Sequence, residues 1–208
     1  FWLLDGTPAD SPLSGELRRA AEILPHPVKN IQWRDVPEAM TALAAEWKRR
    51  QDSGAGQERN IFLLVHGLQR YRVLRRTEDD FGFSVSNDEK AESADKQFAE
   101  ILREGPALGM HILTWSDMLN TAERTFDRQS LREFDHRVLL QMSAGDSSNL
   151  IDSPAANQLG FHRALYYSEE NGVLEKFRPY ALMSESLLKN ITARFGAKSK
   201  ERRAKSKE

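Results

Sequence analysis

The stretch Asn60–Arg70, with the sequence NIFLLVHGLQR, constrains the fold of this chain more than any other. Its five consecutive apolar residues, Ile61 to Val65, lie between polar and charged flanks. An apolar run this short, rich in Val, Ile and Phe, is typical of a strand buried on both faces, and such strands occupy the middle of parallel sheets. His66 and Gly67 follow the run directly, so this strand ends without a carboxylate.

Length and composition fit one domain of ordinary size and exclude several classes of protein. The chain has 208 residues and a formal net charge of -1, so no overall field demands nucleic acid or an anionic membrane as a partner. It has no cysteine, which excludes disulfides and thiolate metal sites and fits a cytoplasmic location. No apolar run approaches the roughly 18 residues of a membrane span. Because Phe1 already lies inside an apolar run, we expect a piece of a longer polypeptide, and a membrane anchor elsewhere in that parent stays open.

Strands and helices are predicted to alternate along the chain. The first strand, Phe1 to Leu4, ends in the turn Asp5-Gly6-Thr7-Pro8, at the edge where open α/β sheets bind ligands. The alternation is typical of an α/β fold with a mostly parallel sheet sandwiched by helices, and Asn171-Gly172 predicts an antiparallel hairpin at one edge. The predicted helices cover residues 17–24, 36–50, 94–108, 116–128 and 184–195, and the remaining strands cover 111–115, 138–142, 163–167 and 173–177.

Local patterns add detail to this outline. Asp35 and Glu38 have the spacing of a capping box at the start of the 36–50 helix. The domain itself is predicted over residues 1–183, followed by a helix and tail over 184–208. Residues 194–208 hold seven basic side chains against two acidic ones, which indicates a solvated end or a weak nucleic-acid contact. The four tryptophans lie in apolar patterns and are predicted to be core residues: Trp2, Trp33, Trp47 and Trp115.

A basic cluster follows the central strand. Its members are Arg70, Arg72, Arg75 and Arg76. The next stretch, Thr77 to Ser93, is rich in acidic residues and poor in apolar ones, so we interpret it as a charged, partly mobile surface loop or as a loop that faces a pore.

In this order of elements, the chain resembles the RecA-like motor domain of the FtsK/SpoIIIE/HerA group of P-loop ATPases. Single fragments carry little information, but they follow the family in the same order, and this order makes the resemblance specific. The fragments are Phe1–Pro8, Pro25–Arg50, Asn60–Gln69, FAEILREGPALGMHILTWS over Phe98–Ser116, and HRVLLQMSAGDSSNLIDSPAANQLGFHRALYY over His136–Tyr167.

The resemblance implies ATP and Mg²⁺ as cofactors of the complete domain, with departures at the catalytic positions. In this family the strand equivalent to Ile61–Val65 ends in an acidic pair, the Walker B acids, which holds magnesium through water and positions the attacking water. His66 and Gly67 occupy those positions here, and the polar sensor falls at Ser116, beside Asp117. The phosphate-binding sequence G-x-x-x-x-G-K-[ST], Walker A, is absent from these residues and is expected upstream of Phe1. Hydrolysis should be feeble unless Asp117 or a neighbouring subunit substitutes.

Further side chains receive roles through the same resemblance. Asp5 falls at the nucleotide-binding edge, and Arg70 and Arg137 are candidates for an arginine finger that acts on a neighbouring subunit. His66 either contacts a nucleotide or is a half-buried histidine bonded to the backbone. The five histidines show no metal-ligand spacing, so no metal site is predicted from these residues.

Two functions of different classes follow. The leading hypothesis is part of an ATP-driven DNA translocase, a hexameric ring in which Arg70, Arg72, Arg75 and Arg76 face duplex DNA in the pore. The alternative is a degenerate ATPase module that regulates or assembles a larger machine, as in type VII secretion ATPases, with a protein substrate as partner. The basic cluster favours the first and the His66-Gly67 pair favours the second; an unrelated α/β enzyme is a third, weaker hypothesis.

Overall fold

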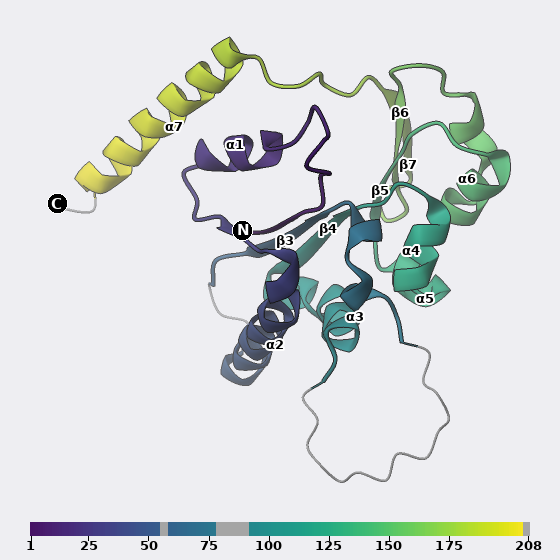
Figure 1. The fold of residues 1–208 in the computed structure, drawn as a ribbon, viewed down its shortest axis with the longest axis horizontal. Helices are drawn as coiled ribbons and strands as arrows, with labels where there is room; N and C mark the ends of the chain where they lie inside the picture. The colour runs from purple at the N-terminus through teal and green to yellow at the C-terminus, as the bar shows by residue number, and fades with distance from the viewer. Residues whose placement is uncertain (55–57, 78–91, 206–208) are drawn as a thin grey trace, which may run out of the picture. The chain divides into compact units, whose positions relative to one another are not determined.

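A computed structural model describes residues 1–54, 58–77 and 92–205 of the chain (Figure 1). The chain divides into two compact units, one formed by Phe1–Thr125 with Met183–Glu208 and the other by Phe126–Leu182. The α/β fold class predicted from the sequence is confirmed, because the first unit is built on a parallel sheet with helices.

Sheet A of the first unit has four parallel strands in the order β2-β1-β3-β4. The central apolar run forms β3, Ile61–His66, which lies between β1, Trp2–Asp5, and β4, Met110–Trp115. The short β2, Lys29–Asn30, pairs with the far side of β1. The predicted inner position of the Ile61–Val65 strand is therefore confirmed. Its Leu63 and Val65 are almost fully buried, whereas Phe62 and Leu64 on the other face are half-buried, so the predicted burial of both faces is only partly confirmed.

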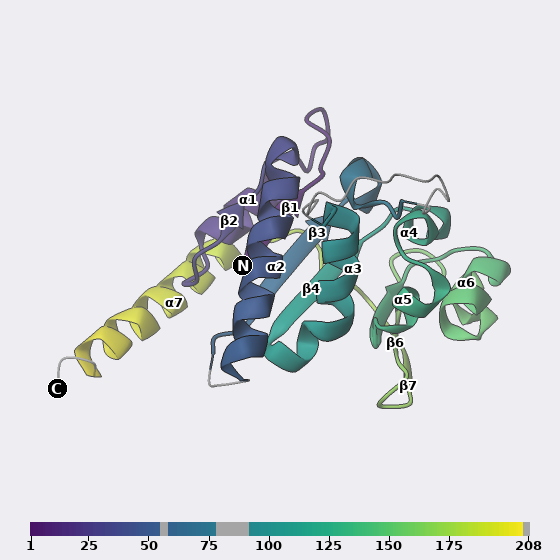
Figure 2. The ribbon, with the colours of Figure 1, turned by 90° about the horizontal axis from the view of Figure 1, so that it is seen from below.

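Two helices cover one face of sheet A. These are α2, Val36–Ser53, and α3, Ala94–Glu104, which run side by side in Figures 1 and 2. Their buried residues follow the helical period, with Met40, Leu43 and Trp47 in α2 and Phe98 and Ile101 in α3. Helix α1, Glu16–Glu22, lies on the opposite side of the sheet and buries none of its residues.

The rest of the first unit consists of short turns and two further helices. The 3₁₀ turns are η1, Trp33–Asp35, η2, Leu68–Arg70, η3, Arg72–Leu74, and η4, Pro106–Leu108; the helices are α4, Leu119–Thr125, and α7, Glu185–Lys205. Asp35 does not cap α2 through its side chain, because its backbone is already turned by η1, so the predicted capping box is wrong. Helix α7 continues past Phe195, where the sequence predicted its end. Most of the predicted Thr77–Ser93 loop lies outside the described residues.

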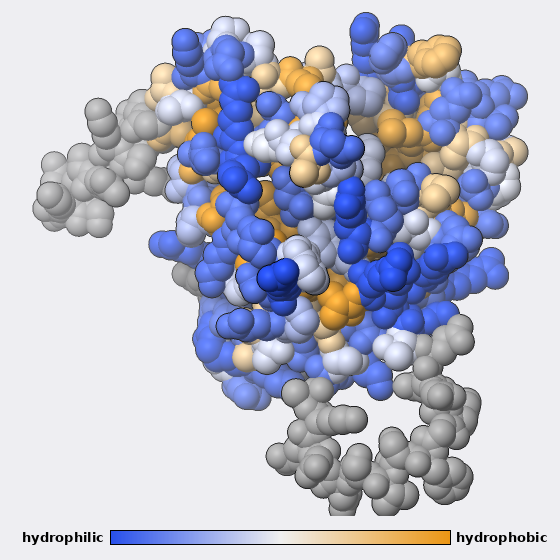
Figure 3. All heavy atoms as spheres, in the orientation of Figure 1, coloured by the Kyte–Doolittle hydropathy of each residue, from blue (hydrophilic) through white to orange (hydrophobic). Residues whose placement is uncertain are grey.

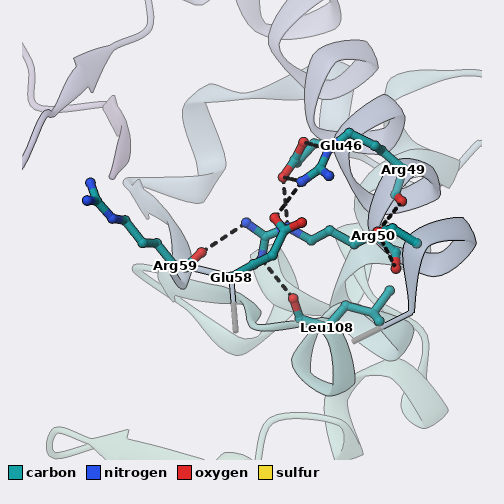
Figure 4. Close-up of polar contacts among 7 residues, drawn as sticks. Glu46, Arg49, Arg50, Glu58, Arg59 and Leu108 are labelled. Atoms are coloured by element: carbon teal, nitrogen blue, oxygen red, sulfur yellow. Dashed lines mark hydrogen bonds and ion pairs between the residues drawn. The ribbon is translucent and has the colours of Figure 1, made fainter. Parts of the chain in front are cut away.

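An arginine ties the amino ends of β3 and β4 to the last turns of α2 (Figure 4). Arg50 is only 4% exposed and donates hydrogen bonds to the carbonyl oxygens of Leu108 at 2.8 Å and Arg59 at 2.9 Å, and to Glu46 Oε1 at 2.8 Å. Arg49, on the same turn, is half exposed and pairs with Glu46 and Glu58. The guanidinium of Arg50 thus satisfies backbone acceptors from two segments that precede neighbouring strands.

The second unit is built on sheet B, whose strands are antiparallel in the order β5-β6-β7. Its elements are α5, Arg128–Arg132, β5, His136–Leu139, α6, Ala144–Ile151, η5, Pro154–Gln158, β6, Ala164–Ser168, and β7, Val173–Phe177. Leu139 and Leu165 pack on Ile151, Ala156 and Leu159 to form its core. The predicted hairpin is confirmed in β6 and β7, but its partner in the described part of the chain is β5 rather than a strand of the parallel sheet.

Surface exposure corrects two residues predicted to be buried. Trp47 lies in the core, whereas Trp33 is 68% exposed and Trp115 is 51% exposed. Hydrophilic side chains dominate the face seen in Figure 3, and hydrophobic ones form separate patches between them. Within the described ranges, no helix combines the length and the apolar character that crossing a membrane requires.

Candidate functional site

Sequence and topology bring three strand ends together at the carboxyl edge of sheet A. Asp5 of β1 is in register with His66 of β3, which is in register with Trp115 of β4. Because the strands are parallel, the loops that follow them all leave from this edge, and such edges are where open α/β sheets bind ligands. The structure thus brings together Asp5 and His66, two residues that the sequence assigned to a nucleotide site.

A hydrogen-bond chain connects these two side chains through Thr7. The backbone N–H and the hydroxyl of Thr7 donate to Asp5 Oδ1 at 2.9 and 2.6 Å, and Thr7 Oγ1 lies 3.2 Å from His66 Nδ1. The threonine hydroxyl has one proton and uses it in the hydrogen bond to the carboxylate. In the contact with His66, Thr7 Oγ1 must therefore be the acceptor and the Nδ1–H of His66 the donor. The ring therefore has its proton on Nδ1 when neutral, and Nε2 is an acceptor.

Two glycines allow the loops after β1 and β3 to touch. The Gly6 N–H donates to the His66 carbonyl oxygen at 2.8 Å, and a Cβ at Gly6 would lie 2.5 Å from that oxygen. Gly67 has φ +75°, and a Cβ there would approach the Gly6 backbone to 3.2 Å. A side chain at either position would push the loops apart. Gly67, expected to stand where the family has a catalytic acid, is thus also a packing residue.

Arg70 and Tyr71 extend this edge beyond β3. Tyr71 is 4% exposed, and burial, aided by the negative charge of Asp5, raises its pKa to about 12. Arg70 is exposed, and its Cγ lies 3.3 Å from the point where a Gly6 Cβ would be, so its aliphatic stem covers Gly6. The guanidinium of Arg70 has no hydrogen-bond or ion-pair partner among the residues of known placement.

The predicted sensor residues follow β4 and are bonded within their own turn. Ser116 Oγ donates to the Met118 carbonyl oxygen at 2.8 Å, and Asp117 Oδ1 accepts from Thr121 Oγ1 at 2.8 Å. Ser116 and Asp117 directly follow Trp115, the last residue of β4, and the ring centroid of Trp115 lies 6.0 Å from that of His66. A catalytic role for Ser116 or Asp117 stays a prediction.

The other predicted arginines have different surroundings. Arg72 and Arg76 are exposed, whereas Arg75 is half-buried and donates from Nη2 to the Gln69 carbonyl oxygen at 3.2 Å. The backbone N–H of Arg76 donates to the carbonyl oxygen of Arg124 at 3.1 Å. The four arginines therefore share a stretch of chain but present unequal charge to solvent.

Arg137 lies in the second unit, where backbone carbonyl groups surround it. Its guanidinium donates to Phe134 at 2.9 Å, to Leu131 at 3.3 Å and to Leu150, and it lies over the Tyr167 ring with its Cζ 5.6 Å from the centroid. Action as an arginine finger would require the guanidinium to leave these carbonyls, and that role stays a prediction.

Thr7 is the site residue that sequence reasoning did not assign. Its bond to His66 spans 59 positions of sequence, so it depends on the register between β1 and β3. The sequence indicated only that the Asp5-Gly6-Thr7-Pro8 turn places the hydroxyl of Thr7 at the edge where ligands bind. It did not show that this hydroxyl contacts His66.

The side chains at this edge do not form a donor set that suits Mg²⁺. The ion takes hard oxygen ligands in octahedral geometry, whereas β3 ends in an imidazole, and Asp5 Oδ1 already accepts two hydrogen bonds from Thr7. In the described part of the chain, no cluster of three or more His, Asp or Glu residues is placed to hold a metal. The chain also lacks the glycine-rich lysine sequence that cradles ATP phosphates in P-loop proteins.

Comparison with known proteins supports the fold. No protein-family model matches the sequence, and no curated protein matches it significantly. The structure is similar to the cytoplasmic domain of the Thermomonospora curvata type VII secretion ATPase EccC, with a TM-score of 0.53, 20% identity, and coverage of 84% of this chain and 22% of that one. It is also similar to ATPases 2 and 3 of EssC from Geobacillus thermodenitrificans, with a TM-score of 0.54, 12% identity, and coverage of 94% and 36%.

These likenesses confirm, at the level of the fold, the resemblance seen in the sequence. The chain has the fold of FtsK/SpoIIIE-type P-loop ATPase domains. It spans 22% and 36% of the lengths of the two matching chains, so it corresponds to a part of each.

Proposed function

We propose that this chain is part of a degenerate ATPase module that binds ATP without turning it over and that regulates or assembles a larger ATPase. The carboxyl end of β3 supports this most directly. His66 is held by Thr7, and Gly67 packs on Gly6 in a left-handed conformation, so neither position offers a carboxylate to a metal or to an attacking water. A positioned acid or base contributes about 10²- to 10⁴-fold in rate, so its loss should leave ATP bound and hydrolysis at this module feeble.

The similarity to EccC and EssC supports type VII secretion as the setting of this module. Both proteins are ATPases, and EccC is a type VII secretion ATPase. We accordingly propose a protein substrate as the polymer that the larger machine moves, a homo-oligomeric ring as its assembly, and a cytoplasmic location for the module.

ATP binding and hydrolysis by the full-length natural protein test the proposal. Replacing His66 with alanine should leave steady-state turnover within about twofold, because His66 takes no part in hydrolysis. His111→Ala is a matched control at the opposite, amino end of the sheet, where His111 stacks on Phe62. A fall of tenfold or more in His66→Ala alone would contradict the proposal, as would the absence of ATP binding by the wild type.

The basic cluster favours a second candidate, an ATP-driven DNA translocase. Arg70 is exposed at the carboxyl edge of sheet A, and Arg72 and Arg76 are exposed in the stretch that follows it, where such side chains can contact phosphates of duplex DNA. In this candidate the module belongs to a hexameric ring that grips the duplex in its pore.

The salt dependence of DNA binding separates the two candidates. Each phosphate contact contributes about 0.9 to the slope of log affinity against log salt concentration. Replacing all four cluster arginines with alanine should therefore flatten the slope by about 2, the contribution of the exposed Arg70 and Arg72, since Arg75 already bonds Gln69. A triple alanine variant of Arg18, Arg128 and Arg163, which are exposed elsewhere, is the control. An unchanged slope in the cluster variant would rule out this candidate.

A further inference from the structure

The carboxyl edge of sheet A combines side chains unsuited to Mg²⁺ with a permanent positive charge. The position that needs a hard oxygen ligand holds the His66 imidazole, and the nearby Asp5 Oδ1 receives two hydrogen bonds from Thr7. His66 Nδ1 lies 3.6 Å from Asp5 Oδ1, so the imidazole and the hydroxyl fill the space beside the carboxylate. A hydrated Mg²⁺ would have to displace this chain of hydrogen bonds.

Arg70 supplies the charge at the same edge. Its backbone N–H donates to the Gly67 carbonyl oxygen at 2.9 Å, which fixes the start of its side chain beside the two touching glycines. Its stem covers Gly6, and its guanidinium is unpartnered among residues whose placement is known. A guanidinium is always protonated and can donate two parallel hydrogen bonds to one phosphate group.

We infer that this edge binds the phosphate groups of a nucleotide without Mg²⁺, and that Arg70 provides the positive charge that a metal provides in other ATPases. The inference rests on the proposed function, because it concerns the same site. The Asp5–Thr7–His66 chain keeps the edge closed to a cation, and the exposed Arg70 neutralises the phosphate from the solvent side.

Trp115 offers a local reporter for this site, because its ring lies beside His66 and is half exposed. The full-length natural protein is labelled with 5-fluorotryptophan, and the ¹⁹F signal of Trp115 is assigned by its loss in Trp115→Phe. ATP is then titrated with excess Mg²⁺ and, separately, with EDTA. We expect the Trp115 signal to respond in both media, with affinities within about threefold of each other.

Two arginine variants test the assignment of the charge. Arg70→Ala should weaken the ATP response by about tenfold or more in both media, because a hydrogen bond between charged groups is lost. Arg72→Ala removes an exposed arginine two positions away and should change the affinity by less than about twofold. Equal effects of the two substitutions would overturn the role of Arg70.

The outcomes separate this inference from the proposed function. A Trp115 response that appears with Mg²⁺ and vanishes in EDTA would overturn metal-free binding while the proposed nucleotide binding stands. No response of Trp115 in either medium would overturn both. A response in both media that Arg70→Ala weakens by about tenfold or more and Arg72→Ala preserves is the result we expect.

Discussion

Replacing Arg50 with alanine is predicted to destabilise the first unit severely. The guanidinium is 4% exposed and bonds the Leu108 and Arg59 carbonyl oxygens and Glu46 at 2.8 to 2.9 Å (Figure 4). Alanine would leave two carbonyl groups without their donor and Glu46 without its buried partner. Breaking a buried, hydrogen-bonded charge pair lowers stability by about 3 to 5 kcal/mol, which sets the expected change in the free energy of unfolding.

Arg49 provides a matched control on the neighbouring position of α2. It also pairs with Glu46, but its side chain is 52% exposed, and exposed ion pairs contribute up to about 1 kcal/mol. Arg49→Ala removes the same charge from the same helix turn without orphaning a buried carbonyl. The stability of Arg50→Lys should lie between those of the two alanine variants, because an ammonium group keeps the positive charge but lacks the planar fork with which the guanidinium reaches all three acceptors.

Equilibrium urea unfolding measures both effects. Fluorescence of Trp47, which is buried in α2, reports on the first unit. If the slope of the transition is unchanged, the shift of its midpoint gives the change in the free energy of unfolding. If the free energies of unfolding of Arg50→Ala and Arg49→Ala agree within about 1 kcal/mol, the argument from buried acceptors is refuted.

Three further predictions concern single positions. Bonds to Arg49, then Arg50, lower the pKa of Glu46 to about 2 from 4.5, so its contribution to stability is complete above about pH 4.5 and lost as the pH falls toward 2; acid unfolding of Glu46→Gln, compared with the wild type, checks this. Gly67→Ala should cost about 1 to 3 kcal/mol in urea unfolding, because φ is +75° and the Gly6 backbone is close, and a neutral substitution would contradict it. Asp95→Ala should speed hydrogen exchange at the Thr77 amide by about tenfold or more, because that N–H donates to Asp95 Oδ2 at 2.9 Å; unchanged exchange would disprove the contact.

Three strands of sheet A, β1, β3 and β4, were predictable from the sequence because each is an apolar run bounded by turn residues, whereas β2, Lys29–Asn30, is polar and was not predicted. Ile61–Val65 became β3 with one added residue, and 111–115 became β4 with one more at its start. The helix predicted over 116–128 is shorter in the structure, where α4 covers Leu119–Thr125 and a separate helix, α5, begins at Arg128. Asp127 Oδ1 accepts the Ser130 N–H at 2.7 Å and starts α5 there, a capping signal visible in the sequence but hidden by the continuous polar pattern around it.

Exposure and long-range pairing were less predictable, for physical reasons. Trp115 ends β4 with half its surface exposed, since alternation along a strand does not show which face a helix covers. The candidate site was predictable as a place, through Asp5 and His66 at strand ends, but not as a network. The bond between Thr7 and His66 follows from the pairing of Asp5 with His66, and apolar patterns fix no register between two strands buried in one sheet.

Electrostatics explains why an imidazole is compatible with Asp5 where an acid would not be. Two carboxylates about 4 Å apart repel each other by roughly 4 kcal/mol at the effective dielectric constant of partly exposed sites. An acidic residue after Val65 would therefore need a cation between itself and Asp5. His66 needs none, because the Thr7 hydroxyl donates a hydrogen bond to Asp5 and accepts one from the Nδ1–H of His66, so each of these contacts joins a donor to an acceptor. The replacement of an acid by His66 thus removes a metal ligand and also removes the need for a metal at this position. The positive charge that a phosphate still requires is then provided by Arg70.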